Sequence, residues 1–207
     1  MNKEVLLEAQ HRFVSRYPGG FSNPELVATG KKFKMDQHGD FAREHFAENR
    51  FDAPRDIVEA MATLVSRSAL VSMFEKPKFK AAVLALSPME IDDWAGSLRE
   101  LLYGDQKTGF QGLVTALSRH KLAKWTLVTV APAYYDQKAE VFVKPSTTKL
   151  IIDRLRLDMT YSATPTWKFY QGYREAVLAM RKIAKAVKAP GNPSFTGFLM
   201  MSLGDHG

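Results

Sequence analysis

Apolar residues recur at intervals of three and four positions through most of the first 120 residues, and this helical period constrains the fold more than any other feature. A face with that spacing is buried against other helices. Prolines and glycines interrupt the pattern, so it predicts several short helices instead of one long one. The predicted helices span about 3–17, 24–33, 54–74, 79–86, 88–103 and 108–119.

Two capping boxes mark helix starts within this region. Ser22 precedes Glu25 by three positions, and Ser87 precedes Glu90 in the same way, so each serine hydroxyl is expected to cap the glutamate N–H. Between residues 34 and 52 the sequence is polar and aromatic. We expect one short helix there, with loops at His38-Gly39 and at 49–53.

The residue pattern changes near position 124. Residues 125–130 and 139–143 are rich in β-branched and aromatic side chains, which is typical of strands, and a polar connection separates them. The sequence therefore predicts an α-rich α+β fold, in which a helical body carries one small antiparallel hairpin or sheet in the C-terminal half. Helices over about 147–157 and 165–188 follow, and the apolar tail at 195–203 is expected to fold back on the body.

The length of 207 residues fits one compact domain covering 1–207. Within it, residues 1–120 form the predicted helical part and residues 121–207 the predicted basic α+β part. We find no internal repeat that would indicate a solenoid.

Cysteine is absent, which excludes disulfides, cysteine-ligated metals and a cysteine nucleophile. The acidic Glu4 and Glu8 interrupt any signal-peptide core, and no apolar run is long enough to cross a membrane. We therefore expect a cytoplasmic, bacterial protein without membrane partners. The histidines and carboxylates do not converge in a ligand pattern, so we expect no metal and no cofactor.

The net charge of +7 is confined to the C-terminal part. Residues 121–207 carry 13 Lys and Arg against 6 Asp and Glu, whereas residues 1–120 carry 16 of each. A basic segment attached to a neutral one indicates a partner with many negative charges, although a solvated lysine surface gives the same pattern.

The first candidate site is the predicted helix start after Pro145. The free N–H groups at a helix N-terminus favour an anion such as phosphate. Hydroxyls and cations surround this start, and the predicted anion-binding residues are Lys144, Ser146, Thr147, Lys149 and Arg154. The segment lacks the glycines of a P-loop.

The second candidate is a basic patch at the end of the last long helix, formed by Arg181, Lys182 and Lys185. Together the two sites predict a binding or regulatory protein whose partner is DNA, RNA or another polyanion. This hypothesis requires the cations after position 120 to gather in space around the helix start.

Three alternatives remain open. One is an enzyme or small-molecule binder with an anion pocket at 144–149, although no catalytic motif supports enzymatic activity. Another is a winged helix-turn-helix over 88–144, in which Gln106 contacts DNA and Lys138 lies at the tip of the wing. The third is a protein-interaction or structural subunit. The sequence leaves the oligomeric state open.

Overall fold

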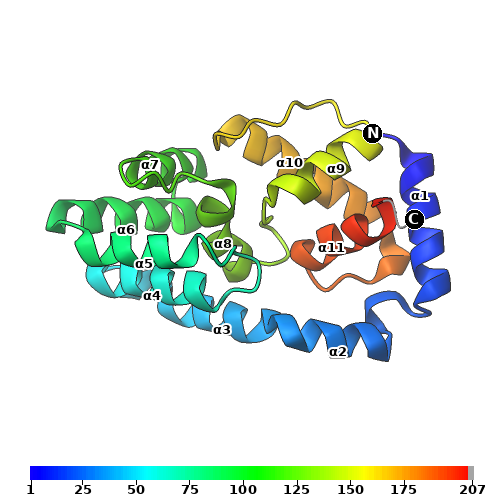
Figure 1. The fold of residues 1–207 in the computed structure, drawn as a ribbon, viewed down its shortest axis with the longest axis horizontal. Helices are drawn as coiled ribbons and strands as arrows, with labels where there is room; N and C mark the ends of the chain where they lie inside the picture. Colours follow the sequence, from blue (N-terminus) through cyan, green and yellow to red (C-terminus); the bar gives the residue numbers. More distant parts are fainter. Residues whose placement is uncertain (205–207) are drawn as a thin grey trace.

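The computed structural model describes residues 1–204, and within this range the chain forms helices and no β-strand (Figure 1). The first six α-helices are α1 (Lys3–Arg16), α2 (Pro24–Phe33), α3 (Met35–His45), α4 (Pro54–Arg67), α5 (Lys76–Ala85) and α6 (Pro88–Tyr103). The other five are α7 (Gln106–Ser118), α8 (Trp125–Tyr135), α9 (Pro145–Arg154), α10 (Trp167–Ile183) and α11 (Asn192–Leu203). Three short 3₁₀ turns are η1 (Gly20–Ser22), η2 (Glu48–Arg50) and η3 (Lys185–Val187).

The helices form two groups with α8 between them (Figure 1). In one group α4 packs on α5 and α6, and α6 packs on α7. In the other group α11 contacts α1, α9 and α10. The central helix α8 touches α3, α4 and α7, so the core is continuous along the long axis.

The predicted hairpin is wrong, because its first strand is the central helix α8. Every residue from Trp125 to Tyr134 is buried. A helix that is buried on all sides needs apolar residues at every position, so the 3.6-residue period disappears from its sequence. β-branched residues such as Val128 and Val130 then look like a strand.

The second predicted strand is an extended segment over 140–144 that pairs with no other strand within the described residues. Side chains satisfy its backbone instead. Asn192 donates from Nδ2 to the carbonyls of Lys138 at 3.0 Å and Glu140 at 2.9 Å. The Val143 N–H donates to Oγ1 of Thr129 at 3.0 Å. The α+β assignment therefore fails at both of its strands.

Some local predictions are confirmed and others need correction. The helix predicted over 54–74 ends at Arg67, and the helix predicted over 165–188 ends at Ile183. Helix α6 has the predicted bounds, and Ser87 and Glu90 form both bonds of the capping box. The α2 cap is Asn23, whose side chain accepts from the Glu25 N–H, and not Ser22. Helix α3 continues through His38 and Gly39, where a loop was expected.

The C-terminal tail folds back as predicted and forms α11. Its Phe195 and Phe198 are fully buried, and the Phe198 ring meets Phe13 of α1 edge-on at 5.0 Å. No described helix is long and apolar enough to cross a membrane. That the whole chain is one compact domain stays a prediction.

Candidate anion-binding surface

The start of α9 exposes only some of the side chains that were predicted to bind an anion. Lys144 is the N-cap residue, but its side chain makes no capping bond. Lys144 and Ser146 are exposed, whereas Thr147 is 7% exposed and Thr148 is fully buried. The Thr147 side chain therefore faces the interior, and Lys144, Ser146 and Lys149 remain as groups available to an anion.

A buried pair of hydroxyls lies behind this helix start. The hydroxyls of Thr148 and Tyr173 lie beside each other and have no other polar partner. Burial between α9 and α10 raises the pKa of Tyr173 to about 12. Both groups are sealed inside the protein, so they contribute nothing to an exposed anion site.

Arg154 lies at the opposite end of α9 from Ser146. The rise of an α-helix separates their backbones by about 12 Å, so the two residues do not form one compact phosphate site. Lys149 lies between them, and its Nζ is 5.0 Å from the centre of the Tyr161 ring. Ser146, Lys149 and Arg154 are therefore spread along the exposed part of α9 instead of surrounding one point.

In the second predicted patch, Arg181 turns inward. Its guanidinium donates to Oδ1 of Asn192 at 3.1 Å and to the Ala189 carbonyl at 3.2 Å. Longer bonds reach the carbonyls of Lys138 and Pro190. Arg181 thus holds the turn before α11 against the 138–140 segment, and its donors are occupied within the protein.

The lysines of this patch point to solvent. Lys182 lies in the last turn of α10, Lys185 begins η3 and Lys188 follows η3, and all three are exposed. We call these three residues the η3 lysine cluster. The sequence from 176 to 204 contains no Asp or Glu, so no nearby acid in that stretch neutralises them.

The turn that carries this cluster is fixed in place by α1 and η1. The Ala186 N–H donates to Oε1 of Gln10 at 3.1 Å. Gly20 has φ +61°, and a Cβ built there would lie 2.2 Å from the Val187 carbonyl oxygen. Glycine at position 20 therefore permits η1 to approach η3 closely. The η3 lysine cluster therefore projects from a backbone whose position is fixed by contacts with α1 and η1.

Arginine and lysine have different roles in the described part of the chain. Five arginines form ion pairs with carboxylates, namely Arg12, Arg43, Arg99, Arg119 and Arg174. Across residues 1–204, no lysine ammonium forms an ion pair or a hydrogen bond with another side chain or the backbone. Apart from Lys149, whose ammonium lies over the Tyr161 ring, the lysines are therefore cations that an external anion can engage without breaking an internal contact.

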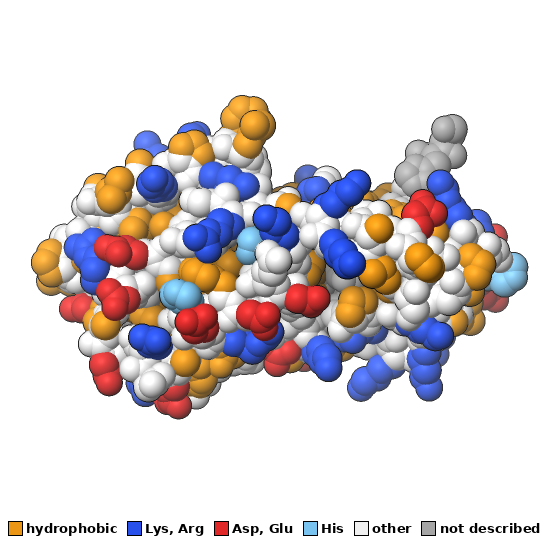
Figure 2. Space-filling view, turned by 90° about the horizontal axis from the view of Figure 1, so that it is seen from below, with side chains coloured by type: hydrophobic (Ala, Val, Ile, Leu, Met, Phe, Trp, Pro, Cys, Tyr) orange, Lys and Arg blue, Asp and Glu red, His pale blue; other side chains and the backbone are white. Residues whose placement is uncertain are grey.

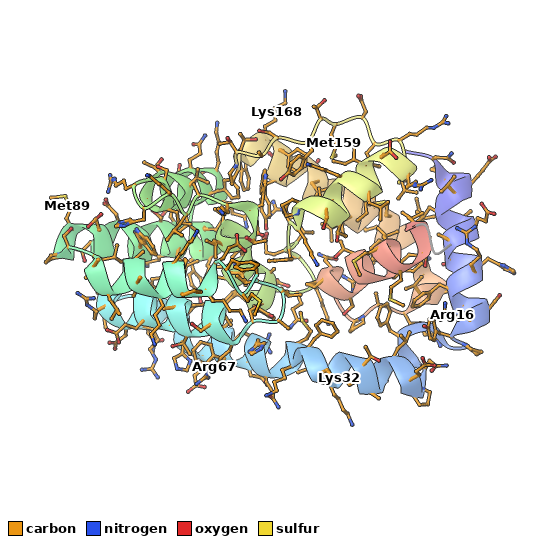
Figure 3. The ribbon with its side chains drawn as sticks, in the orientation of Figure 1. Arg16, Lys32, Arg67, Met89, Met159 and Lys168 are labelled. Atoms are coloured by element: carbon orange, nitrogen blue, oxygen red, sulfur yellow. The ribbon has the colours of Figure 1, made fainter. Side chains whose placement is uncertain are left out.

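One face of the molecule shows the resulting charge distribution. In Figure 2, Lys and Arg side chains dominate the half that holds α1 and α2, whereas the half that holds α4 mixes both signs. Lys32 extends outward from α2 on this face (Figure 3). The basic surface thus includes N-terminal cations, which the division of the sequence at residue 120 did not predict.

The two predicted patches do not merge. In Figure 1 α11 lies between α9 and the end of α10, and it contacts both helices. An extended polyanion could touch both surfaces, but a small ligand could not. The C-terminal cations therefore do not all gather around the start of α9, as the sequence hypothesis required.

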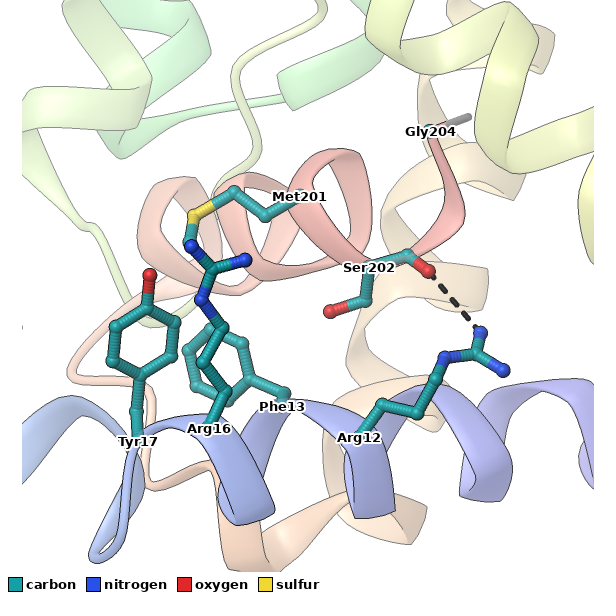
Figure 4. A pocket seen from close by; sticks show the side chains of 7 residues that line it. All are labelled: Arg12, Phe13, Arg16, Tyr17, Met201, Ser202 and Gly204. Atoms are coloured by element: carbon teal, nitrogen blue, oxygen red, sulfur yellow. Dashed lines mark hydrogen bonds between the residues drawn. The ribbon is translucent and has the colours of Figure 1, made fainter. Parts of the chain in front are cut away.

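A shallow hollow of about 470 Å³ lies between α1 and α11 (Figure 4). Arg12 closes one side by donating to the Ser202 carbonyl at 3.3 Å, and it also pairs with Glu8. Arg16 points over the hollow beside Met201 and has its guanidinium 5.5 Å from the Tyr17 ring. Arg16 thus adds a cation to the half of the molecule that holds α1 and α2. The described residues that line the hollow include no acid that could act together with a base in catalysis.

The most buried charged group is Glu140, in the extended segment. It receives hydrogen bonds from Arg174 at 2.7 Å, Tyr170 at 2.5 Å and Gln106 at 3.1 Å. Burial and the adjacent carboxylate raise the pKa of Tyr170. All of these donors are used in joining α7 and α10 to the segment, so the network is structural.

This network also removes the winged-helix alternative. The expected wing, with Lys138 at its tip, is the turn after α8 and not a β-hairpin. Gln106, the expected DNA contact, is engaged by Arg174 and Glu140. The order of two helices and a hairpin on which that hypothesis depended is absent from the described residues.

Comparison with protein-family models, curated proteins and solved structures finds no match for this chain. Within residues 1–204, no group of three or more histidine and carboxylate side chains is arranged to hold a metal ion. The arrangement of charge on the surface is therefore the feature from which function is inferred.

Two features of the basic surface lie outside the predicted patches. Lys188 falls in the same predicted helix end as Lys182 and Lys185 but was not included in the patch, although the stretch from 176 to 204 contains no acid. The support from Gln10 and Gly20 joins residues more than 160 positions apart. No local pattern in the sequence could have indicated that support.

Proposed function

We propose that this chain is a binding protein that engages nucleic acid through the η3 lysine cluster. The observation that carries the proposal is that Lys182, Lys185 and Lys188 are exposed, unpaired and held on one fixed turn. Three ammonium groups within seven residues match the close spacing of phosphates along a nucleic-acid strand.

Lys144 and Lys149 on α9 provide a second set of contacts for the same polymer. They are exposed, and the sequence around them from 141 to 152 contains no acid. Because α11 separates them from the cluster, only a ligand long enough to cross α11 reaches both. A long polyanion therefore fits this surface better than a single phosphate compound does.

Lysine contacts of this kind bind the backbone and do not select a sequence. Phosphate contacts position a protein on a duplex, whereas specificity needs side chains that reach base edges. The η3 lysine cluster consists of lysines alone, whose ammonium groups mainly contact phosphates. Binding is thus expected to depend strongly on salt and only weakly on base sequence.

The test is fluorescence anisotropy with labelled duplex DNA and single-stranded RNA of about 25 nucleotides, between about 50 and 200 mM salt. The variant is Lys182→Glu, Lys185→Glu and Lys188→Glu combined. It should bind at least about tenfold more weakly at low salt, and its salt slope on duplex DNA should fall by about 3.

The matched control reverses three lysines on another helix, with Lys76→Glu, Lys78→Glu and Lys80→Glu combined. It changes the net charge by the same amount and should keep most of the affinity. Equal losses in both triple variants would mean that net charge alone drives binding, and this would overturn the proposal. Absence of binding at the lowest salt would also overturn it.

A further inference from the structure

The outer side of α5 carries a continuous apolar row that no other part of the described chain covers. Pro77, Ala81 and Leu84 are exposed on α5 itself at helical spacings of four and three residues, Phe74 is exposed in the turn just before α5, and Pro88 is exposed at the start of α6. We call these five residues the α5 stripe. Met73 and Met89 extend it at its two ends, and both are about three-quarters exposed (75% and 74%).

This exposure is not a consequence of α5 being loosely attached. The opposite side of α5 is buried, with Phe79 at 0% and Val83 at 3% exposure. The Phe79 ring lies 5.4 Å from the Trp94 ring of α6. Helix α5, which lies beside α4 and α6 in Figure 1, therefore has one apolar side packed on the body and a second apolar side facing solvent.

The turn before α5 is ordered in a way that keeps Phe74 outside. The Phe74 N–H donates to Oγ of Ser72 at 3.2 Å. Glu75 accepts from the Ser72 N–H at 3.3 Å and from the Thr126 hydroxyl at 2.8 Å. Phe74 is 76% exposed, as is Leu84. At the far end Met89 extends beyond the ribbon of α6 (Figure 3).

Lysines border the α5 stripe on both sides. At about 100° per residue, Lys78 falls on one edge of the stripe and Lys80 on the other. Helix α5 contains no acid, and Glu75 is the only acid between residues 70 and 89. The Glu75 carboxylate is already held by Ser72 and Thr126, so the border of the stripe is positively charged.

We infer that the α5 stripe docks an amphipathic helix of a partner protein, whose apolar side is bordered by Asp and Glu. The three-four spacing is the one that lets the side chains of two helices interlock. Ala81 and Pro77 are small, while Phe74 and Leu84 are large, which leaves a shallow saddle for a crossing helix. The bordering lysines then face acids on the partner.

The same features argue against other occupants. In a symmetric pair of α5 helices, Lys78 and Lys80 would meet the same lysines of the second copy, and like charges would oppose each other. A bilayer would gain little from inserting alanine and proline, which make up much of the stripe. A helix bordered by acids satisfies both the apolar row and its charged edges.

The test is a displayed library of helical peptides, each about 20 residues long, with a fixed apolar stripe and randomised border positions. Selection on the full chain should return peptides rich in Asp and Glu at both borders. Phe74→Ser with Leu84→Ser should weaken their binding at least tenfold. Lys78→Glu with Lys80→Glu should do the same and should favour peptides with basic borders.

The control is Leu7→Ser, an exposed leucine of α1 that lies away from α5. It should leave peptide binding unchanged. Selected peptides with neutral or basic borders would overturn the inference, as would binding that survives the loss of Phe74 and Leu84. If the protein self-associates and Leu84→Ser abolishes this, the α5 stripe is an interface with a second copy of the chain, and the inference is overturned. Binding to vesicles with about 30% anionic lipid that Phe74→Ser abolishes would assign it to a membrane.

Discussion

Arg174 donates to Glu140 across 2.7 Å, and this ion pair is the most buried one in the described chain, with side-chain exposures of 16% and 8%. It connects α10 to the extended segment that follows α8. The Arg174 guanidinium also lies 5.5 Å from the Trp167 ring and 5.6 Å from the Tyr170 ring. The pair therefore fixes a segment that has no strand partner.

Removing one member of this pair should destabilise the protein strongly. Arg174→Ala leaves the Glu140 carboxylate buried without its counter-charge, and the expected loss in unfolding free energy is about 3–5 kcal/mol. Urea denaturation of the variant and the parent measures it. Arg119→Ala is the control, because its pair with Asp93 is about half exposed and should cost at most about 1 kcal/mol. Similar losses in the two variants would contradict a structural role for the buried pair.

The stability of the protein should also depend on Asn192, because its side chain hydrogen-bonds the 138–140 backbone in place of a neighbouring strand. Asn192→Ala leaves the buried Glu140 carbonyl without its donor and removes the bonds of Asn192 to the Lys138 carbonyl and to Arg181, so we expect a loss of about 3 kcal/mol. Thermal unfolding and hydrogen exchange over 138–143 measure it. Asn23→Ala removes an exposed helix cap and should cost about 1 kcal/mol. If Asn192→Ala cost no more than this control, the segment would owe its position to other contacts.

The fold could be predicted from the sequence wherever a helix is half exposed. The Pro88 start and the Tyr103 end of α6 follow from a capping box and an amphipathic period, and both are confirmed. Helix α8 could not be predicted in this way, because burial of all its sides removes that period. Only tertiary contacts distinguish such a run from a buried strand.

The residues of the candidate surfaces also differ in whether the sequence alone could predict their exposure. Exposure of Lys182 and Lys185 follows from their place in the last turn of an amphipathic helix and beyond it. The inward turn of Arg181 does not, because its partner Asn192 approaches through a loop. The outer stripe of α5 was not predicted, because exposure of an apolar residue such as Leu84 depends on which side of α5 packs against the body.

The α6 capping box should give a pH-dependent contribution to stability. Bonds from the backbone and hydroxyl of Ser87, and then from His120, lower the pKa of Glu90 from 4.5 to about 2. A depressed carboxyl pKa stabilises the folded state above the unfolded value, and this contribution is lost as the pH falls from about 4.5 toward 2. Glu90→Gln should therefore be less stable than the parent at pH 6.

The difference between parent and Glu90→Gln should shrink as the pH falls below 4.5 and should nearly vanish near pH 2, as followed by urea denaturation at each pH. A carboxyl NMR titration of Glu90 in the folded protein should give its midpoint near pH 2. The control is Asp92→Asn, because Asp92 is an exposed acid of the same helix that takes no part in the capping box. A constant difference across this pH range would show that the carboxylate charge does not stabilise the box.

Two glycines on neighbouring helices should respond in opposite directions to alanine. Gly109 lies where α7 crosses α6, and a Cβ there would be 2.1 Å from the Leu101 backbone nitrogen. Gly109→Ala must push the two helices apart, so we expect a loss of at least about 2 kcal/mol. Gly96 of α6 has nothing within 4 Å of its Cβ position, and Gly96→Ala should gain about 0.5–1 kcal/mol from helix propensity. Because both glycines are inside helices, propensity favours alanine equally at the two sites, and the difference in their unfolding free energies isolates the helix contact. Equal gains in both variants would mean that α6 and α7 do not approach each other as closely as their backbones indicate.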